Sequence, residues 1–250
     1  MTGDFLALLE KQSLPSLPPA TAGVPPLEAT TVFAFHCADG VIIGGDHRAT
    51  AGNTVFSDKT EKILELDSHS LMAIAGVPAM AFEMARTLQT AFEFYRRSQL
   101  QPMSLAAKLR ALSRLLRDNL PATLQGVGIV APIFAGVETT DSAPRPVIYF
   151  YDPLGAQFEA TSFAGSGSGT PFIRSVLHYL ENWGNPRPAQ MPLQQAVLLA
   201  NRLLMTAAQF DTATGGVHPE QGDFATIKLL SAQGLRSVLS EEQAQFWKNA

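Results

Sequence analysis

Few residues of this chain are grouped in a way that is typical of known chemistry. The run Gly165–Gly169 lacks the third glycine of a dinucleotide-binding loop, because Thr170 stands there, and Gly167 replaces the central serine of a nucleophile elbow. The five histidines show none of the spacings that zinc sites use, and Cys37 is the one cysteine. The sequence therefore predicts neither a metal nor a cofactor.

The stretch that starts at Thr30 carries a different pattern. It consists of Thr30–Phe35, Asp39–Asn53, Lys62 and Ile74–Gly76. These residues resemble the start of a proteasome β-type subunit of the bacterial 20S type, which is a threonine peptidase among the N-terminal-nucleophile hydrolases. The resemblance continues, with decreasing sharpness, to about Leu239.

The resemblance implies that Thr30 is the nucleophile of a threonine endopeptidase. Asp46, Arg48, Lys62 and Gly76 follow Thr30 at the intervals of the family pattern without a gap. In that arrangement Lys62 lies beside the Thr30 hydroxyl and stabilises its developing alkoxide, and Asp46 holds the lysine ammonium. Arg48 supports them, and the backbone N–H of Gly76 donates to the oxyanion of the tetrahedral intermediate.

Two later loops also match the family. The segment Gly165–Gly167 resembles its Gly-Ser-Gly loop, and the segment 211–216 resembles its Asp-x-x-Ser/Thr-Gly-Gly loop. The resemblance thus implies that Ser166, Asp211 and Thr214 support the active site.

Four more residues are implied in substrate binding. In the family, the peptide backbone binds at the position of Thr50 as an added strand. Ala49, Ile74 and Pro78 occupy positions that line the first specificity pocket. None of these side chains is charged, so an apolar residue before the cleaved bond is expected.

A threonine at a chain terminus has a physical advantage as a nucleophile. Its hydroxyl attacks well only when a nearby base takes the proton, and a terminal threonine can use its own α-amine. The reference pKa of an α-amine, roughly 7.7–8.0, suits a general base near neutral pH, whereas an amide nitrogen has no such basicity. Removal of the residues before Thr30 would therefore switch the enzyme on.

Residues 1–29 differ in composition from the chain that follows. Five of them are prolines, which remove backbone donors and disfavour helical geometry. The resemblance implies that residues 1–29 are a propeptide and that residues 30–250 form a single catalytic domain.

The order of expected elements favours an α+β fold. Strands are predicted at 31–37, 41–45, 61–67, 70–75, 128–135, 146–151, 158–164, 224–230 and 235–239. Helices are predicted at 78–95, 104–116, 170–181 and 192–210. On the first helix, one apolar stripe is expected, made of Ala79, Phe82, Ala85, Leu88, Phe92 and Tyr95. Segregated blocks of strands and helices indicate antiparallel sheets packed by helices, and the resemblance implies a four-layer αββα sandwich.

The composition of the chain argues against nucleic acid and membranes as partners. The chain is 46% hydrophobic and 16% charged, so it can bury a sizeable core, and its formal net charge is −4 without a basic block, which argues against nucleic acid. No stretch is suited to cross a bilayer, so no membrane partner is expected. The single cysteine fits a reducing compartment, and cytoplasm is predicted.

Three functions remain open at this point. The first is a threonine endopeptidase that degrades unfolded proteins inside homo-oligomeric stacked rings, seven-membered by analogy, with an α-type ring and a hexameric ATPase as candidate partners. The second is a non-catalytic scaffold subunit that keeps residues 1–29, because Ala29 stands where the family commonly has glycine. The third is an amidase of the same class that acts on a small molecule. Particle size and N-terminal processing distinguish the three.

Overall fold

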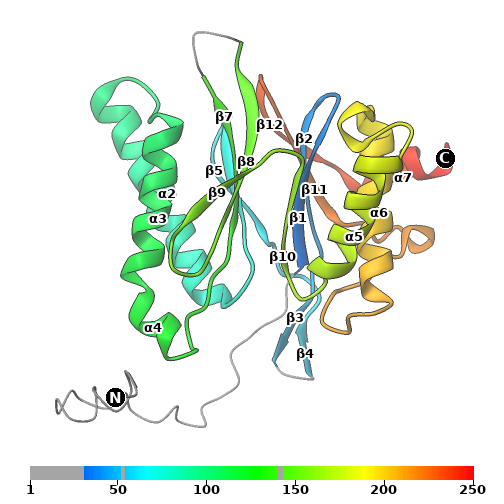
Figure 1. Ribbon diagram of the computed structural model, residues 1–250, viewed down its shortest axis with the longest axis horizontal. Coiled ribbons are helices and arrows are strands. Elements are labelled where there is room, and N and C mark those ends of the chain that lie inside the picture. The colour runs from blue at the N-terminus through cyan, green and yellow to red at the C-terminus, as the bar shows by residue number, and fades with distance from the viewer. Residues whose placement is uncertain (1–30, 52–53, 140–142) are drawn as a thin grey trace, which may run out of the picture.

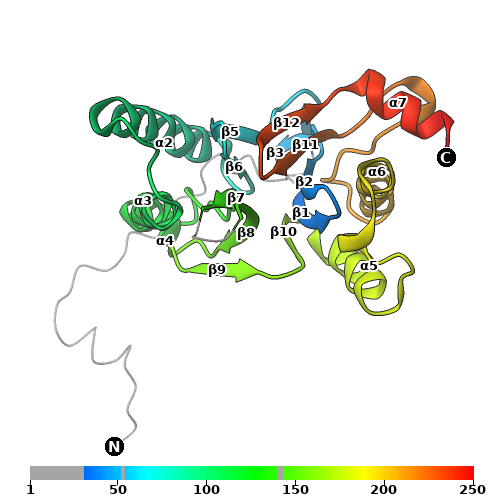
Figure 2. The same ribbon diagram turned by 90° about the horizontal axis from the view of Figure 1, so that it is seen from above.

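Two antiparallel sheets face each other in the middle of the molecule, and helices cover the outer face of each (Figure 1). The computed structural model describes residues 31–51, 54–139 and 143–250. Seen from above, the order is helices, sheet, sheet, helices (Figure 2). The expected four-layer αββα sandwich of an α+β chain is thus confirmed.

The first sheet has five strands in the order β10-β1-β2-β11-β12. Their bounds are β1 Thr31–Cys37, β2 Gly40–Gly45, β10 Phe163–Gly167, β11 Thr226–Ser231 and β12 Gly234–Val238. It is covered by α5 Thr170–Trp183 and α6 Leu193–Ala208, with the short helix η1 Pro188–Gln190 between them (Figure 1). The C-terminal helix α7 Ser240–Lys248 packs on α6.

The second sheet also has five strands, in the order β5-β6-β7-β8-β9. Their bounds are β5 Ile63–Asp67, β6 Ser70–Ala73, β7 Ile133–Glu138, β8 Arg145–Tyr151 and β9 Gln157–Ala160. The helices on its side are α2 Pro78–Gln99, α3 Leu105–Asp118 and α4 Leu120–Leu124. Two further elements are the hairpin β3 Ala49–Ala51 with β4 Thr54–Ser57, and the short helix η2 Pro219–Gln221.

Strand β1 is buried on both faces, which explains its nearly continuous apolar sequence. Phe33 and Phe35 pack in the core shared with α5 and α6. Val32 and Ala34 point the opposite way, into the core between the sheets. Because side chains alternate along a strand, Thr31 belongs to the helix-facing side with Phe33. The start of β1 is therefore held inside the molecule from two directions.

Two predicted features differ from the structure. The run 158–164 is not one strand, because the chain crosses at 161–162 from β9 in one sheet to β10 in the other. The buried stripe of α2 is rotated: Ala85, Leu88 and Phe92 are buried as expected, but Ala79 is exposed. In its place Ala81 and Met84 are buried, because this face is the one turned to the second sheet.

Helix α7 was not predicted, and its sequence explains why. Its one buried residue is Gln243, so no apolar stripe marks it. The Gln243 amide donates to the carbonyls of Ala225 and Val238 and accepts from Asn201. Hydrogen bonds thus replace the hydrophobic pattern on which helix prediction depends.

In the described part of the chain, no helix combines the length and apolar character needed to cross a bilayer.

An ion pair between a buried lysine and a half-buried carboxylate joins α3 to the end of β5. Lys108 Nζ lies 2.5 Å from Asp67 Oδ2 and 3.3 Å from Ser70 Oγ, and 5.3 Å from the centre of the Phe92 ring. Burial acts to raise the pKa of Asp67, but the hydrogen bond and charge of Lys108 outweigh it, so the pKa of this carboxyl lies below its ordinary value. A depressed carboxyl pKa means that the pair stabilises the fold only while Asp67 is ionised.

We expect Lys108→Met to lower the free energy of unfolding by about 2 kcal/mol at pH 7, because it leaves a half-buried carboxylate without its cation. The unfolded-state pKa of Asp is about 3.9, so this loss is full above that pH and shrinks as the pH falls through the lower folded-state pKa. Denaturant unfolding at several pH values measures it, with the exposed Lys248→Met as the control. A loss that is the same at pH 7 and below pH 3 would contradict the pairing.

Candidate active site

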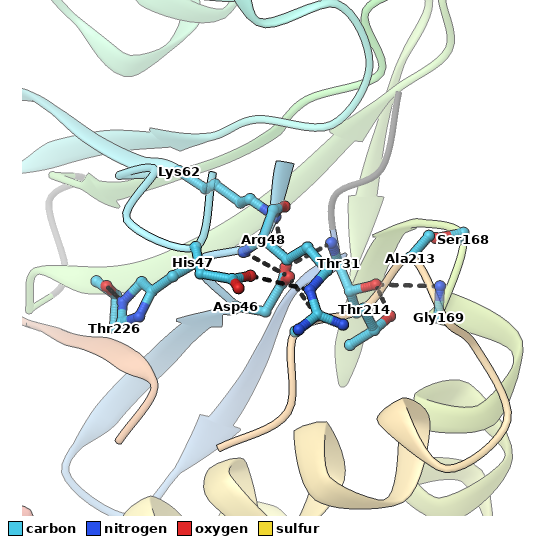
Figure 3. A network of polar contacts seen from close by, with 12 residues as sticks. Thr31, Asp46, His47, Arg48, Lys62, Ser168, Gly169, Ala213, Thr214 and Thr226 are labelled. Atoms are coloured by element: carbon cyan, nitrogen blue, oxygen red, sulfur yellow. Dashed lines mark hydrogen bonds and ion pairs between the residues drawn. The ribbon is translucent and has the colours of Figure 1, made fainter. Parts of the chain in front are cut away.

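Four segments that are distant in the sequence meet at the start of β1 (Figure 3). Asp46 follows the last residue of β2, and Lys62 precedes the first residue of β5. Gly169 lies directly before α5, and Thr214 lies in the loop after α6. Antiparallel pairing of β1 with both β2 and β10 brings the end of β2 and the end of β10 to the same edge as Thr31. Residues that are far apart in the sequence thus surround one strand terminus.

Asp46 is the centre of this cluster and is 1% exposed. Its Oδ1 accepts hydrogen bonds from Lys62 Nζ at 2.7 Å and from Thr31 N at 2.9 Å. Its Oδ2 accepts from Arg48 N at 3.0 Å and from Gly215 N at 2.7 Å. Four donors around a buried carboxylate satisfy both of its oxygens and fix its orientation. Asp46 therefore holds both a lysine ammonium and the first peptide of β1.

Lys62 is as deeply buried as Asp46, at 1% exposure. Besides Asp46, its Nζ donates to the backbone carbonyl of Arg48. Burial lowers the pKa of Lys62, while the charge and hydrogen bond of Asp46 act against this shift. A desolvated lysine whose pKa is lowered is closer to the range in which it exchanges a proton, a property often found at catalytic sites.

A second carboxylate approaches Thr31 from the other side. Thr31 Oγ1 lies 2.6 Å from Thr214 Oγ1, and Thr214 Oγ1 donates to Asp211 Oδ2 at 2.5 Å. Gly169 N donates to Thr31 Oγ1 at 3.0 Å, and Ser168 Oγ donates to Asp211 Oδ2 at 2.7 Å. Figure 3 shows Lys62 on one side of Asp46 and the group of Thr31, Thr214 and Gly169 on the other. The predicted residues Asp211 and Thr214 thus belong to one hydrogen-bonded chain.

Ser166 does not contact this chain, which corrects the expectation drawn from the Gly-Ser-Gly loop. Its Oγ donates to the carbonyl of Ala131 at 2.6 Å. Gly167 has φ +102° and ends β10, so the chain turns before Ser168 and directs that hydroxyl to Asp211. The run contains two overlapping Gly-Ser-Gly triplets, and spacing alone does not distinguish them. The serine that contacts Asp211 is Ser168.

Gly76 occupies a position that no other residue fits without strain. Its φ is +108°, and an added Cβ would lie 2.1 Å from the carbonyl oxygen of Ile129. Hydrogen bonds on both sides hold it against the segment 129–131: Ala131 N donates to Ala75 O, and Val77 N donates to Ile129 O. The backbone at the predicted oxyanion position is therefore rigid.

The four predicted substrate-binding residues lie on segments next to this cluster. Ala49 and Thr50 begin β3 and are each 4% exposed. Ile74, 3% exposed, donates its backbone N–H to the carbonyl of Lys62 at 2.8 Å. Pro78 is half-buried and is the first residue of α2, two residues after Gly76. Their role in binding remains a prediction.

Arg48 and His47 anchor the turn that carries Asp46. Arg48 Nε lies 2.9 Å from Asp58 Oδ1, and its Nη1 donates to the carbonyl of Thr212 at 3.4 Å. His47 Nε2 lies 2.6 Å from Thr226 Oγ1 on β11. The Arg48 side chain thus joins the turn after β2 to Asp58 and to the loop after α6, and its supporting part at the site remains a prediction.

Thr30, the predicted nucleophile, lies outside the described residues, as do residues 1–29. Four residues that the sequence analysis missed belong to the cluster: Thr31, Ser168, Gly169 and Gly215. The alternation of β1 was a signal for Thr31, since a threonine on the helix-facing side of a buried strand needs hydrogen-bond partners.

Among the described residues, no group of three or more His, Cys, Asp and Glu side chains could hold a metal ion.

Comparisons with known proteins agree on one family. The family model for proteasome subunits matches residues 27–218. The proteasome subunit beta 2 of Thermomonospora curvata is 35% identical over 251 residues, which is 98% of this chain and 86% of that protein. The proteasome subunit beta of Jonesia denitrificans is 36% identical over 244 residues, covering 96% and 78%. That of Streptomyces griseus is 31% identical over 245 residues, covering 97% and 84%.

Proposed function

Because this chain belongs to the proteasome subunit family, and to its β-type proteases, we propose that it is a threonine endopeptidase activated by removal of residues 1–29. The observation that carries the proposal is the buried pair of Asp46 and Lys62 at the start of β1, 2.7 Å apart. A fully buried lysine held by a carboxylate is costly to fold, and a strand terminus beside it is a suitable place for a nucleophile.

In the proposed reaction, the Thr30 hydroxyl oxygen attacks the carbonyl carbon of a peptide bond. Its proton passes to the α-amine of Thr30, which exists only once the bond to Ala29 is broken. The Lys62 ammonium stabilises the oxygen as it loses this proton, and the N–H of Gly76 stabilises the new oxyanion. Collapse breaks the C–N bond, the departing amine takes a proton, and water then hydrolyses the ester to release the acid.

The contacts of Thr31 favour Thr30 as the nucleophile over its neighbour. Thr31 is 0% exposed, and its Oγ1 already accepts from Gly169 N and contacts Thr214 Oγ1. A hydroxyl engaged in this way would have to break two hydrogen bonds before it could reach a substrate. Lys62 Nζ donates to Asp46 Oδ1 and to the Arg48 carbonyl, which places a cation beside the start of β1.

A proteasome subunit works within a multi-subunit ring particle. We propose that copies of this chain form stacked seven-membered rings that enclose the sites and degrade unfolded proteins, with an α-type ring and a hexameric ATPase as partners, in the cytoplasm. The exposed aromatic side chains of Phe94, Trp183 and Phe210, each about 70% exposed, support assembly, because large apolar side chains are commonly covered by neighbouring subunits.

Mass spectrometry after incubation with a threonine-directed inhibitor, such as an epoxyketone, tests this function. We expect the subunit to lose residues 1–29 and to carry the inhibitor on Thr30, because the cleavage uses the Thr30 hydroxyl and creates the free α-amine, and the inhibitor reacts where both groups are on one residue. An assembled particle of full-length, unlabelled chains would instead support the scaffold function. Labelled chains that elute as monomers on size exclusion would support a small-molecule amidase.

A further inference from the structure

We propose that Thr31 is a positioning residue, whose side-chain hydroxyl fixes the residue before it for attack. The inference rests on the proposed function, since it concerns the same site. Thr31 is bound through two of its groups to two different carboxylates: its backbone N–H donates to Asp46, and its hydroxyl is linked through Thr214 to Asp211. The peptide group between residues 30 and 31 supplies the N–H that Asp46 holds.

The hydrogen bonds around Thr31 run in one direction. Gly169 N–H donates to Thr31 Oγ1, which leaves the Thr31 hydroxyl proton for Thr214 Oγ1, 2.6 Å away. The Thr214 hydroxyl donates in turn to Asp211 Oδ2. Each hydroxyl therefore accepts one hydrogen bond and donates the next, and the chain ends on a carboxylate. Such a chain has one arrangement that satisfies every member, so it holds Thr31 in one rotamer.

The hydroxyls of Thr31 and Thr214 are buried and closely packed against Gly169. Thr31 is 0% and Thr214 is 1% exposed, so water does not replace either hydroxyl easily. A Cβ on Gly169 would lie 2.4 Å from Thr214 Oγ1 and 2.7 Å from Thr31 Oγ1. The absence of a side chain at Gly169 is thus what allows its N–H to reach Thr31. Residues from the loop before α5 and the loop after α6 thus enclose the Thr31 hydroxyl.

The expected effect of this positioning is on turnover and not on substrate affinity. A nucleophile must be held close to its attack geometry, and a small displacement lowers the rate of the chemical step. Thr31 is buried behind the site, so it offers no surface to a substrate. Removal of its hydroxyl should therefore lower kcat and leave KM unchanged.

The test is a double-mutant cycle on Thr31→Val and Thr214→Val in the assembled particle. Loss of one hydrogen bond of ordinary strength predicts a fall in kcat of about tenfold for each single variant. The double variant should also lose about tenfold, and not the roughly hundredfold that independent residues would give, because both substitutions break the same chain. Intact mass gives the fraction of processed subunits, by which each rate is divided.

Two further variants separate positioning from packing. Thr31→Ser keeps the hydroxyl and removes a methyl group, and its kcat should stay within about twofold of the wild type. Thr206→Val removes a threonine hydroxyl that donates to the carbonyl of Arg202 within α6, and should leave both constants unchanged. Thermal unfolding of Thr31→Val shows whether the folded particle persists, and if it does not, Thr214→Val with Thr214→Ser as its rescue decides the question.

The outcomes distinguish this inference from the proposed function. If the wild type hydrolyses peptides and Thr31→Val has a normal kcat, or if Thr31→Ser is as slow as Thr31→Val, the positioning role is wrong while the protease function stands. Multiplying effects in the double variant would also overturn it. If the wild type neither hydrolyses peptides nor reacts at Thr30, the proposed function is wrong and the role of Thr31 falls with it.

Discussion

Replacing Thr30 with alanine is expected to abolish peptide hydrolysis and to leave residues 1–29 attached to the chain. The substitution removes the hydroxyl that both reactions need, while Asp46 and Lys62 keep their contacts with each other. Loss of a nucleophile should lower the rate by at least about a thousandfold, because the remaining groups only stabilise charge. Initial rates on a fluorogenic peptide and the intact mass of the subunit measure the two effects.

The matched control is Thr30→Ser, which keeps a hydroxyl and an α-amine on the same residue. We expect it to be processed and to retain measurable turnover, since only a methyl group is lost. Hydrolysis by Thr30→Ala above the background of an empty preparation would contradict the assignment of the nucleophile. A Thr30→Ala chain that loses residues 1–29 would show instead that another protease removes them.

The fold was predictable from the segregated order of its strands and helices and from the resemblance to a known family, and the composition of β1 points the same way. The run from Val32 to Phe35 is apolar at every position, so β1 had to be covered on both faces, and two sheets with outer helices meet that need. The missed elements lack this kind of signal. Helix α7 is held by the Gln243 amide, and β4 is exposed along most of its length. An element held by hydrogen bonds, or exposed at the edge of the molecule, has no periodic pattern of apolar residues from which it could be predicted.

The candidate site was predicted from the spacing of the family pattern, at strand ends as well as in the loop that carries Asp211 and Thr214. The structure brings Asp46 and Lys62 together because each adjoins the end of a core strand, so a fixed number of residues gives a fixed position. The serine was misplaced because Ser166 and Ser168 stand on either side of Gly167, where the strand ends. Only the backbone conformation of Gly167 determines which hydroxyl reaches Asp211. Local sequence does not encode that choice.

Asp46 and Asp211 make different kinds of contact at the start of β1. Asp46 binds a cation, Lys62, and a backbone N–H of Thr31, so it combines charge compensation with positioning. Asp211 is half-buried and reaches Thr31 only through the Thr214 hydroxyl. Substitution of Asp46 would therefore disturb the lysine and the strand together, whereas changes on the Asp211 side can be made one hydroxyl at a time.

We expect Lys62→Met to abolish hydrolysis in a particle that still assembles. Methionine fills most of the volume of the lysine side chain, and Asp46 keeps hydrogen bonds from the backbone N–H groups of Thr31, Arg48 and Gly215. A buried carboxylate that keeps these donors is costly but is not left bare, so the loss of stability should stay below the 3–5 kcal/mol or so that breaking a buried ion pair usually costs. The loss of activity has another cause, which is the missing charge beside the proposed alkoxide.

Lys108→Met is the matched control for Lys62→Met, because Lys108 is also buried and paired with a carboxylate, on the helix side of the second sheet. It should lose stability and keep normal turnover per processed subunit, whereas Lys62→Met should lose turnover by at least about a thousandfold. Size exclusion, unfolding in denaturant and peptide hydrolysis are measured on both. If Lys62→Met assembles and hydrolyses peptides at the wild-type rate, the buried lysine is structural, and the pair with Asp46 serves only to hold the start of β1.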